Sequence, residues 1–83
     1  MELCRGRVVK VRTGRDAGSF MAAAGFDGSR VYLVNGKDRR LDKPKAKNYK
    51  HIALTKEVLD EESMSSDKLI SRRLREITEK ADA

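Results

Sequence analysis

The sequence predicts a mainly β fold, a small five-stranded barrel followed by a short C-terminal helix. Three observations lead to this prediction. Up to residue 54, short runs rich in β-branched residues alternate with turns that contain glycine. A polar segment then separates these runs from the rest of the chain. Beyond it, apolar residues recur at helical spacing, with Ile70, Leu74 and Ile77 at i, i+4 and i+7. An open α+β sheet is the competing architecture.

The first two strands are predicted at residues 8–12 and 19–24, on either side of a loop with two glycines. Gly14 and Gly18 are expected to shape this loop, because glycine enters backbone conformations with positive φ at little cost. In the second strand, residues 22–24 are all alanine.

The remaining strands are predicted around a hairpin and a lysine-rich loop. A third strand is expected at residues 30–34, which are rich in β-formers, and Asn35-Gly36 is a strong signal for a type I′ turn. The chain should therefore return as a fourth strand at 37–41. Pro44 then marks a loop of lysines, because proline cannot donate to a sheet ladder, and a fifth strand follows at 49–54.

The C-terminal part is predicted to be an acidic polar linker at 55–66 and an amphipathic helix at 67–80. Ser66 is the expected N-cap. The polar side of the helix offers opposite charges at i,i+4, in the pairs Arg72–Glu76, Arg75–Glu79 and Glu76–Lys80. Because so short a helix is marginal alone, it either docks on the barrel, remains a tail or folds on a partner.

The charge of the chain predicts a polyanionic partner for its first part. The whole sequence has 19 Lys plus Arg against 13 Asp plus Glu, a net charge of +6. Residues 1–54 hold 13 of the basic side chains and only 5 of the acidic ones. Nucleic acid is the commonest partner of such a segment. A membrane surface is not expected, because no amphipathic or apolar anchor accompanies the charge.

The segment Gly6–Gly18, a basic strand, a loop and a glycine that opens the next strand, resembles a KOW motif. With Asn35-Gly36 as a later turn and the basic stretch 42–48, residues 2–54 resemble the small bacterial KOW-domain RNA-binding proteins, which are related to the archaeal and eukaryotic large-subunit ribosomal protein of the fourteen type. This resemblance implies an SH3-like barrel that binds RNA near the ribosome. The chain departs from the family at residues 22–24, where relatives usually carry bulky β-formers.

The candidate RNA-binding residues are the cations of the expected loops and one aromatic residue. Arginine makes bidentate contacts that favour selectivity, whereas lysine acts mainly as a positioning charge. Tyr49 is the better candidate for stacking on a base, ahead of Phe26, while Phe20 and Tyr32 are expected in the core. The full set is Lys10, Arg12, Arg15, Lys37, Arg39, Arg40, Lys43, Lys45, Lys47, Tyr49 and Lys50.

The sequence argues against catalysis and against a metal site. Cys4 is the only cysteine and His51 the only histidine, and they stand far apart in the chain. We therefore expect no enzyme activity, no cofactor and no internal disulfide. The charged N-terminus does not resemble a signal peptide, so a cytoplasmic protein is expected, monomeric when free.

Two functions remain open from the sequence. The first is binding of structured ribosomal RNA as part of a ribonucleoprotein in translation. The second is a protein-interaction adaptor on the ribosome or the transcription-elongation machinery, which would use the barrel or the stripe of Ile70, Leu74 and Ile77.

Overall fold

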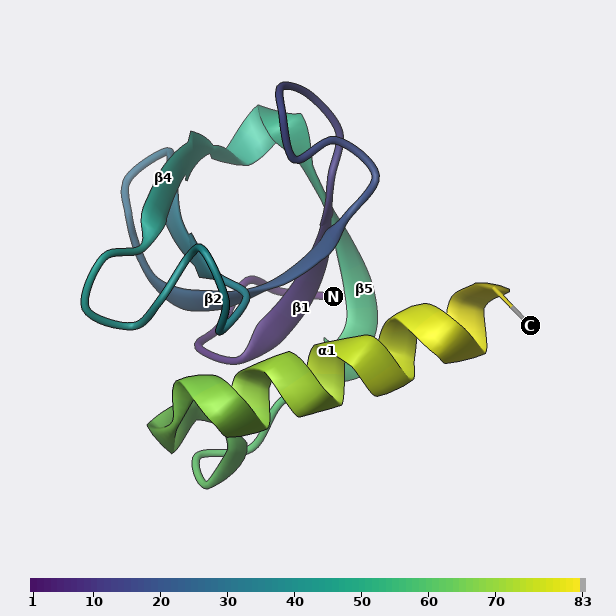
Figure 1. Ribbon diagram of the computed structural model, residues 1–83. Helices are drawn as coiled ribbons and strands as arrows, with labels where there is room; N and C mark the ends of the chain where they lie inside the picture. Colours follow the sequence, from purple (N-terminus) through teal and green to yellow (C-terminus); the bar gives the residue numbers. More distant parts are fainter. Residues whose placement is uncertain (83) are drawn as a thin grey trace.

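The computed structural model describes residues 1–82 and shows a five-stranded antiparallel sheet with one C-terminal helix (Figure 1). The strands follow the spatial order β4-β3-β2-β1-β5, so β4 and β5 are the edges and no ladder joins them. The mainly β fold with a C-terminal helix is thereby confirmed, as a curved and unclosed sheet. The elements are β1 (Arg7–Val11), β2 (Phe20–Asp27), β3 (Arg30–Val34), β4 (Lys45–Asn48), the 3-10 turn η1 (Tyr49–His51), β5 (Ile52–Val58), the 3-10 turn η2 (Ser63–Ser65) and α1 (Asp67–Asp82).

The sheet buries apolar residues on both of its faces, because successive side chains of a strand point to opposite sides. Val9, Met21 and Leu33 belong to a cluster inside the curl of the sheet. Their neighbours Val8 and Ala22 belong to a second cluster, which packs against α1. Figure 1 shows α1 lying along the outside of the curled sheet, beside β1 and β5. Because both faces of the sheet pack against apolar clusters, the central strands β1, β2 and β3 consist largely of consecutive apolar residues.

The alanines of β2 are small because this strand is covered on both sides. Ala22 and Ala23 are fully buried, Ala22 in the cluster under α1 and Ala23 in the cluster inside the curl. A bulky side chain at position 22 would hold the helix away from the sheet. The small side chains of this strand thus allow the helix to pack closely on the sheet.

The fourth strand lies elsewhere than the sequence predicts. Residues 37–41 form a loop, and the strand that pairs with β3 is β4, inside the stretch expected to be a lysine-rich loop. The predicted two-residue turn at Asn35-Gly36 is also wrong, because no strand follows it directly. The Asn35 side chain accepts hydrogen bonds from the backbone N–H groups of Lys37 and Arg39, which bends the chain into a wider loop.

The tight hairpin of the sheet is the turn at Gly28-Ser29, which joins β2 to β3. Asp27 pairs with Arg30 across it, and Gly28 has φ +60° while Ser29 does not have positive φ, as in a type II′ turn. β2 therefore runs three residues beyond its predicted end at Ala24, with a bulge between Ala23 and Gly25.

β5 also runs past its predicted end, so the segment expected to be a linker begins inside a strand. β5 starts at Ile52, because Tyr49–His51 form η1, and it extends to Val58. Leu59 and Met64 follow, both buried in the cluster under α1. Two apolar residues in a polar stretch thus complete the core.

The helix docks on the sheet, which settles the three alternatives left open by the sequence. Ile70 and Leu74 are buried and Ile77 packs beside them. The Ser66 hydroxyl accepts the Leu69 N–H at 3.3 Å, as expected of an N-cap. In place of the predicted i,i+4 pairs, the ion pair found along α1 within residues 1–82 is Arg73–Glu76, at i,i+3 and 3.3 Å.

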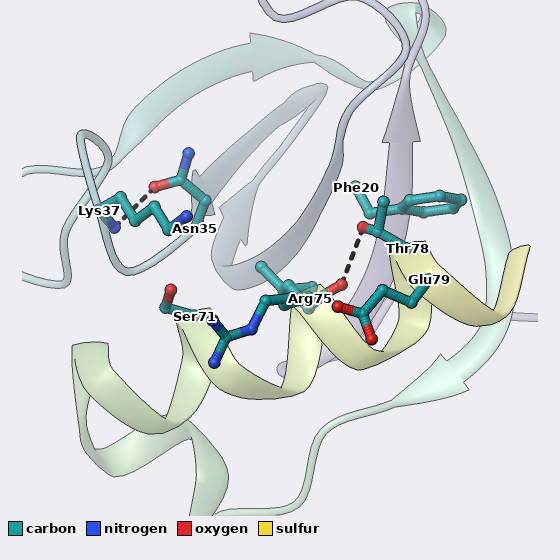
Figure 2. A pocket seen from close by; sticks show the side chains of 8 residues that line it. Phe20, Asn35, Lys37, Ser71, Arg75, Thr78 and Glu79 are labelled. Carbon is teal, nitrogen blue, oxygen red and sulfur yellow. Dashed lines mark hydrogen bonds between the residues drawn. The ribbon is translucent and has the colours of Figure 1, made fainter. Parts of the chain in front are cut away.

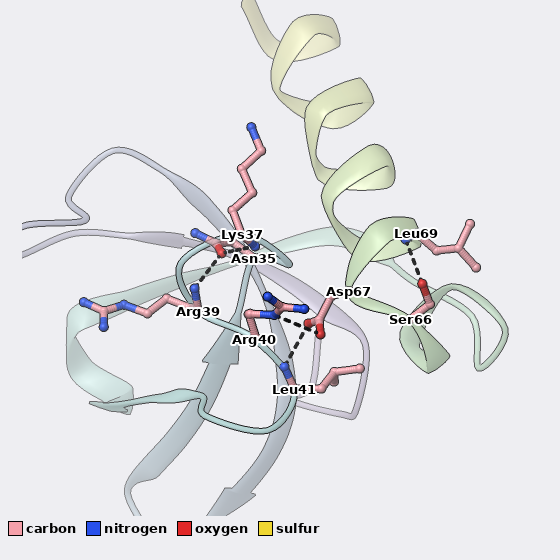
Figure 3. Close-up of polar contacts among 8 residues, drawn as sticks. All are labelled: Asn35, Lys37, Arg39, Arg40, Leu41, Ser66, Asp67 and Leu69. Atoms are coloured by element: carbon pink, nitrogen blue, oxygen red, sulfur yellow. Dashed lines mark hydrogen bonds and ion pairs between the residues drawn. The ribbon is translucent and has the colours of Figure 1, made fainter.

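The first turn of the helix is fixed to the β3–β4 loop through one carboxylate. Asp67 Oδ1 accepts the Leu41 N–H at 2.8 Å, and Asp67 Oδ2 lies 3.6 Å from Arg40 Nε (Figure 3). A Cβ at Gly36 would overlap the carbonyl oxygen of Asp67, so the loop touches the helix backbone directly. Within the described residues, α1 is too short and too polar to cross a membrane.

Candidate nucleic-acid interface

The β1–β2 loop, residues 12–19, is compact and presents two exposed arginines. Gly14 and Gly18 have φ +82° and +89°, as predicted for this loop. The Gly18 N–H donates to the Val11 carbonyl at 2.7 Å, which closes the loop at its base. Arg12 and Arg15 are exposed and take part in no ion pair among residues 1–82. Their guanidinium groups are therefore free to bind an anion.

The β3–β4 loop lies against this first loop. Arg39 Nη2 lies 3.6 Å from Asp16 Oδ2, and both side chains are largely buried. The loop is also stiffened internally, because Asn35 Nδ2 donates to Asp38 Oδ1 at 2.7 Å. This hydrogen bond, the Asp38 backbone N–H and the nearby positive charges of Arg39 and Arg15 hold the pKa of Asp38 below its ordinary value of 3.8.

The structure gives Arg39 and Arg40, two of the predicted selective contacts, partners within the chain. Arg39 pairs with Asp16, and 28% of its side chain is exposed. Arg40 pairs with Asp67 of α1 and remains 62% exposed. Arg39 thus joins the β3–β4 loop to the β1–β2 loop, and Arg40 joins it to α1.

The lysines expected around Pro44 lie on or beside the edge strand β4. We call Lys43, Lys45, Lys47 and Lys50 the β4 lysines. Lys45 and Lys47 belong to the strand itself, and the other two stand just before and after it. None of the four takes part in an ion pair within residues 1–82. Positive charges along a free edge also discourage pairing with other strands.

Lys47 connects β4 to the β1–β2 loop. Its Nζ would lie 2.7 Å from a Cβ at Gly14, so the ammonium group rests against the glycine backbone. Lys47 is half-buried, whereas Lys43, Lys45 and Lys50 are exposed. The structure thus brings Lys47 together with the loop that holds Arg12 and Arg15.

Lys10 points away from Lys45 and Lys47. On β1 it shares the face of Val8, which packs toward α1, and its ammonium group lies 5.6 Å from the centre of the Phe20 ring. Lys45 and Lys47 pair with Leu33 and Val31, which face the inside of the curl. Lys37, also exposed, stands at the rim of a groove beside α1.

That groove runs between α1 and the start of β2. Figure 2 shows Lys37 and Asn35 on one side, Arg75, Thr78 and Glu79 on the helix, and Phe20 at the far end. The groove carries both positive and negative charge, so it favours no particular ligand charge.

The aromatic residues are divided between the core and the surface. Phe20 and Tyr32 are half-buried, and Phe20 packs against the cluster under α1. Tyr49 and Phe26 are 44% and 51% exposed. Tyr49 lies in η1, directly after β4, where its N–H donates to the Ser29 carbonyl at 2.7 Å. A ring in this position is accessible to a base.

Two polar residues beside the β2–β3 turn are not among the predicted RNA-binding residues. Arg30 and Asn48 are paired between β3 and β4 and line one hollow together with Lys47. The predicted strand at 30–34 already placed Arg30 at the start of a strand. Without the register of β4, nothing in the sequence joins Arg30 to Asn48.

Comparisons with known proteins give no family for this chain. It matches no family model, and the search of curated proteins found no match. Its function must therefore be inferred from the arrangement of its own residues.

Proposed function

We propose that the protein is a small RNA-binding protein with an SH3-like barrel of the KOW type. Its ligand is RNA, and structured ribosomal RNA is the favoured form. The observation that carries the proposal is the set of cations around β4 and the β1–β2 loop that have no ion-pair partner among residues 1–82. These cations are Arg12, Arg15, Lys43, Lys45, Lys47 and Lys50.

The mechanism follows from the chemistry of a phosphate backbone. Lysines that contact phosphates release condensed counterions, which supplies affinity without regard to sequence. Arg12 and Arg15 stand on a loop closed by backbone hydrogen bonds, so their positions are restricted before binding. Tyr49 adds an exposed ring for an unpaired base. Affinity then comes mainly from charge, and selectivity from the two arginines and the ring.

Of the two surfaces that the adaptor alternative could use, the barrel and the helix stripe, the stripe is covered. Ile70 and Leu74 are buried against the sheet, so the helix stripe is already occupied by the chain itself. An adaptor would have to use another face.

The proposal is tested by measuring RNA affinity as a function of salt concentration. Lys43, Lys45 and Lys50 are changed together to alanine, and Lys47 is kept because it rests on the β1–β2 loop. If each lysine contacts one phosphate, the slope of log affinity against log salt becomes shallower by roughly 2 to 3, at about 0.7–0.9 per contact. The affinities for structured and unstructured RNA should fall by similar factors.

The matched control removes the same charge from the exposed side of α1, by changing Lys68, Arg72 and Lys80 to alanine. This variant should keep the parent slope. Equal slopes in the parent and the β4 variant would exclude the β4 lysines from the interface. A parent that binds no RNA even at low salt would refute the function.

Association with the ribosome needs a separate measurement. A cell lysate containing the protein is fractionated on a density gradient before and after limited nuclease digestion. Protein held by RNA should co-migrate with a ribosomal subunit and leave it on digestion. Protein that stays bound after digestion would indicate the adaptor function.

A further inference from the structure

One edge of the sheet, the strand β4, is regular and has an unpaired outer side. Its 4 residues pair with β3 in continuous register. No strand within residues 1–82 pairs with the other side of β4. An edge of this kind presents backbone N–H and carbonyl groups that have no partner in the sheet. The geometry of β4 therefore allows a further strand to be added.

The register shows which backbone groups point to the open side. In an antiparallel ladder, residue pairs that exchange backbone hydrogen bonds alternate with pairs that do not. The Tyr49 N–H donates to the Ser29 carbonyl at 2.7 Å, so the next pair, Asn48–Arg30, is one without such bonds. Alternation places Ala46, two residues earlier, in the same class. The backbone N–H groups of Ala46 and Asn48 therefore point away from β3.

The side chains of β4 leave room for an approaching chain. Ala46 and Asn48 are both exposed, and both help to line a hollow beside the strand. Ala46 presents only a methyl group between Lys45 and Lys47. The donors at the edge are thus accessible to another backbone.

The charge around β4 favours an acidic partner. Residues 43–56 contain no acidic residue, and none of the β4 lysines takes part in an ion pair within residues 1–82. Opposite charges on neighbouring strands stabilise their pairing, whereas like charges destabilise it. A second copy of β4 would bring like charge to this edge. The same lysines therefore disfavour self-association and favour a strand that carries carboxylates.

The other edge strand, β5, is less suited to pairing because its ladder with β1 is irregular. The register shifts between Arg7 and Val9. At this point the Thr55 hydroxyl donates to the Val8 carbonyl at 2.7 Å. An irregularity of this kind bends an edge strand and hinders pairing with another chain. The regular edge of this sheet is therefore β4.

We infer that the free edge of β4 binds an extended acidic segment of a partner protein as an added strand. This inference goes beyond RNA binding, and it gives the adaptor alternative a surface other than the helix stripe. RNA would account for the lysines, but an extended polypeptide also matches the backbone donors of Ala46 and Asn48, because its own carbonyl groups recur at the spacing of a strand. Both ligands need the β4 lysines, so they should exclude each other.

Protection against aggregation is a simpler explanation for part of this arrangement. Lysines on an edge strand keep other strands away, which accounts for Lys45 and Lys47. Lys43 and Lys50 lie outside the strand and protect no ladder group. Binding of an acidic segment accounts for all four lysines together with the exposed alanine.

The test uses a short peptide in which glutamate alternates with valine. Amide hydrogen exchange of the protein is followed by NMR with and without this peptide. Exchange should slow at Ala46 and Asn48, whose N–H groups face the open side, and should change little at Lys45 and Lys47, whose N–H groups already bind β3. A control peptide with proline in place of each valine keeps the charge but cannot pair. Equal binding of both peptides, or binding without protection of Ala46 and Asn48, would refute the added strand.

A variant of the protein blocks the edge and keeps every lysine. Ala46→Pro removes an N–H that points away from β3, and proline is accepted at such positions of edge strands, so the variant should melt close to the parent. Its affinity for the glutamate–valine peptide should fall about tenfold or more. Ala46→Val keeps the N–H and should bind like the parent. A folded Ala46→Pro that binds the peptide as well as the parent would contradict the inference. If this variant does not fold, the comparison of the two peptides on the parent decides.

RNA binding provides the last comparison. Ala46→Pro should bind RNA as the parent does, because its charge is unchanged. Excess peptide should displace RNA from the parent but not from this variant, and failure to displace it from the parent would exclude a shared surface. If the parent binds RNA but the peptide protects no amide, the strand site is refuted and RNA binding stands. If the peptide protects the edge and the parent binds no RNA, the strand site stands and the proposed function is refuted.

Discussion

The closest approach between the β3–β4 loop and the helix occurs at Gly36, and a methyl group there should displace α1. Gly36 has φ +79°, and an added Cβ would overlap the Asp67 carbonyl oxygen and lie 2.8 Å from the Ser71 nitrogen. Both atoms belong to the helix backbone, which cannot yield as a flexible side chain would. In Gly36→Ala, the helix or the loop must therefore move.

The size of the effect follows from two separate costs. The left-handed conformation costs alanine roughly 1–2 kcal/mol. If α1 withdraws by about 1 Å, Ile70 and Leu74 lose a quarter to a half of their packing attraction. Since burial of each such side chain is worth about 1.5–3 kcal/mol, the additional loss is about 1–3 kcal/mol.

Gly18 supplies the matched control, because it also has a positive φ but lacks the contact. Its φ is +89°, and no atom of the described part of the chain lies within 4 Å of an added Cβ. Gly18→Ala should therefore show the conformational cost alone. Thermal unfolding followed by circular dichroism measures both variants, and each kcal/mol lowers the midpoint by roughly 4–8 °C in a domain of this size. If the two variants melt at the same temperature, close approach of the loop does not position the helix.

Three further predictions concern the same framework. Asp67→Ala should destabilise the fold by about 1–3 kcal/mol, because the Leu41 N–H loses its acceptor. Arg40→Ala should cost at most about 1 kcal/mol, since its ion pair is exposed. If urea unfolding finds Arg40→Ala the less stable of the two, the ion pair and not the hydrogen bond holds the loop on the helix. Ala22→Leu should lower the free energy of unfolding by about 1–3 kcal/mol, because it overpacks the cluster under α1. Ala53→Leu, at an exposed position of β5, should be nearly neutral. Equal melting temperatures of the two variants would show that the helix adapts freely. The pKa of Asp38 is lowered in the fold, so its stabilising contribution is present above pH 3.8 and is lost as the pH falls through the lowered value; in melts from pH 6 to pH 2, the advantage of the parent over Asp38→Asn should shrink only at the acid end, and a constant advantage would contradict this linkage.

The sequence predicted those elements whose signals are local. Runs of β-branched and other β-forming residues placed β1 and β3 within a residue of their bounds, and the two glycines marked the β1–β2 loop. The Ser66 cap and the apolar stripe predicted α1 because both signals lie within the helix itself. Each of these predictions needs only the physics of neighbouring residues.

The prediction of β4 failed because two local signals competed. Asn35-Gly36 favours a tight turn, but the Asn35 side chain instead caps backbone N–H groups within a wider loop. The lysines of β4 disguised a strand as a loop, since an edge strand with one exposed side needs few apolar residues. Leu59 and Met64 were missed as core residues because their burial depends on where α1 docks.

Ion pairs between distant residues divide the cations of the chain into two kinds, those that hold the fold together and those that remain unpaired within residues 1–82. Asp16 and Asp67 each draw one arginine of the β3–β4 loop into the framework, Arg39 toward the first loop and Arg40 toward the helix. The acidic side chains near the basic loops are thereby used to hold those loops in place, and they do not neutralise the cations around β4. Arg12, Arg15 and the β4 lysines therefore take part in no ion pair within residues 1–82. A chain selected only for solubility would gain nothing from that arrangement, whereas a chain that binds a phosphate backbone gains both affinity and register from it.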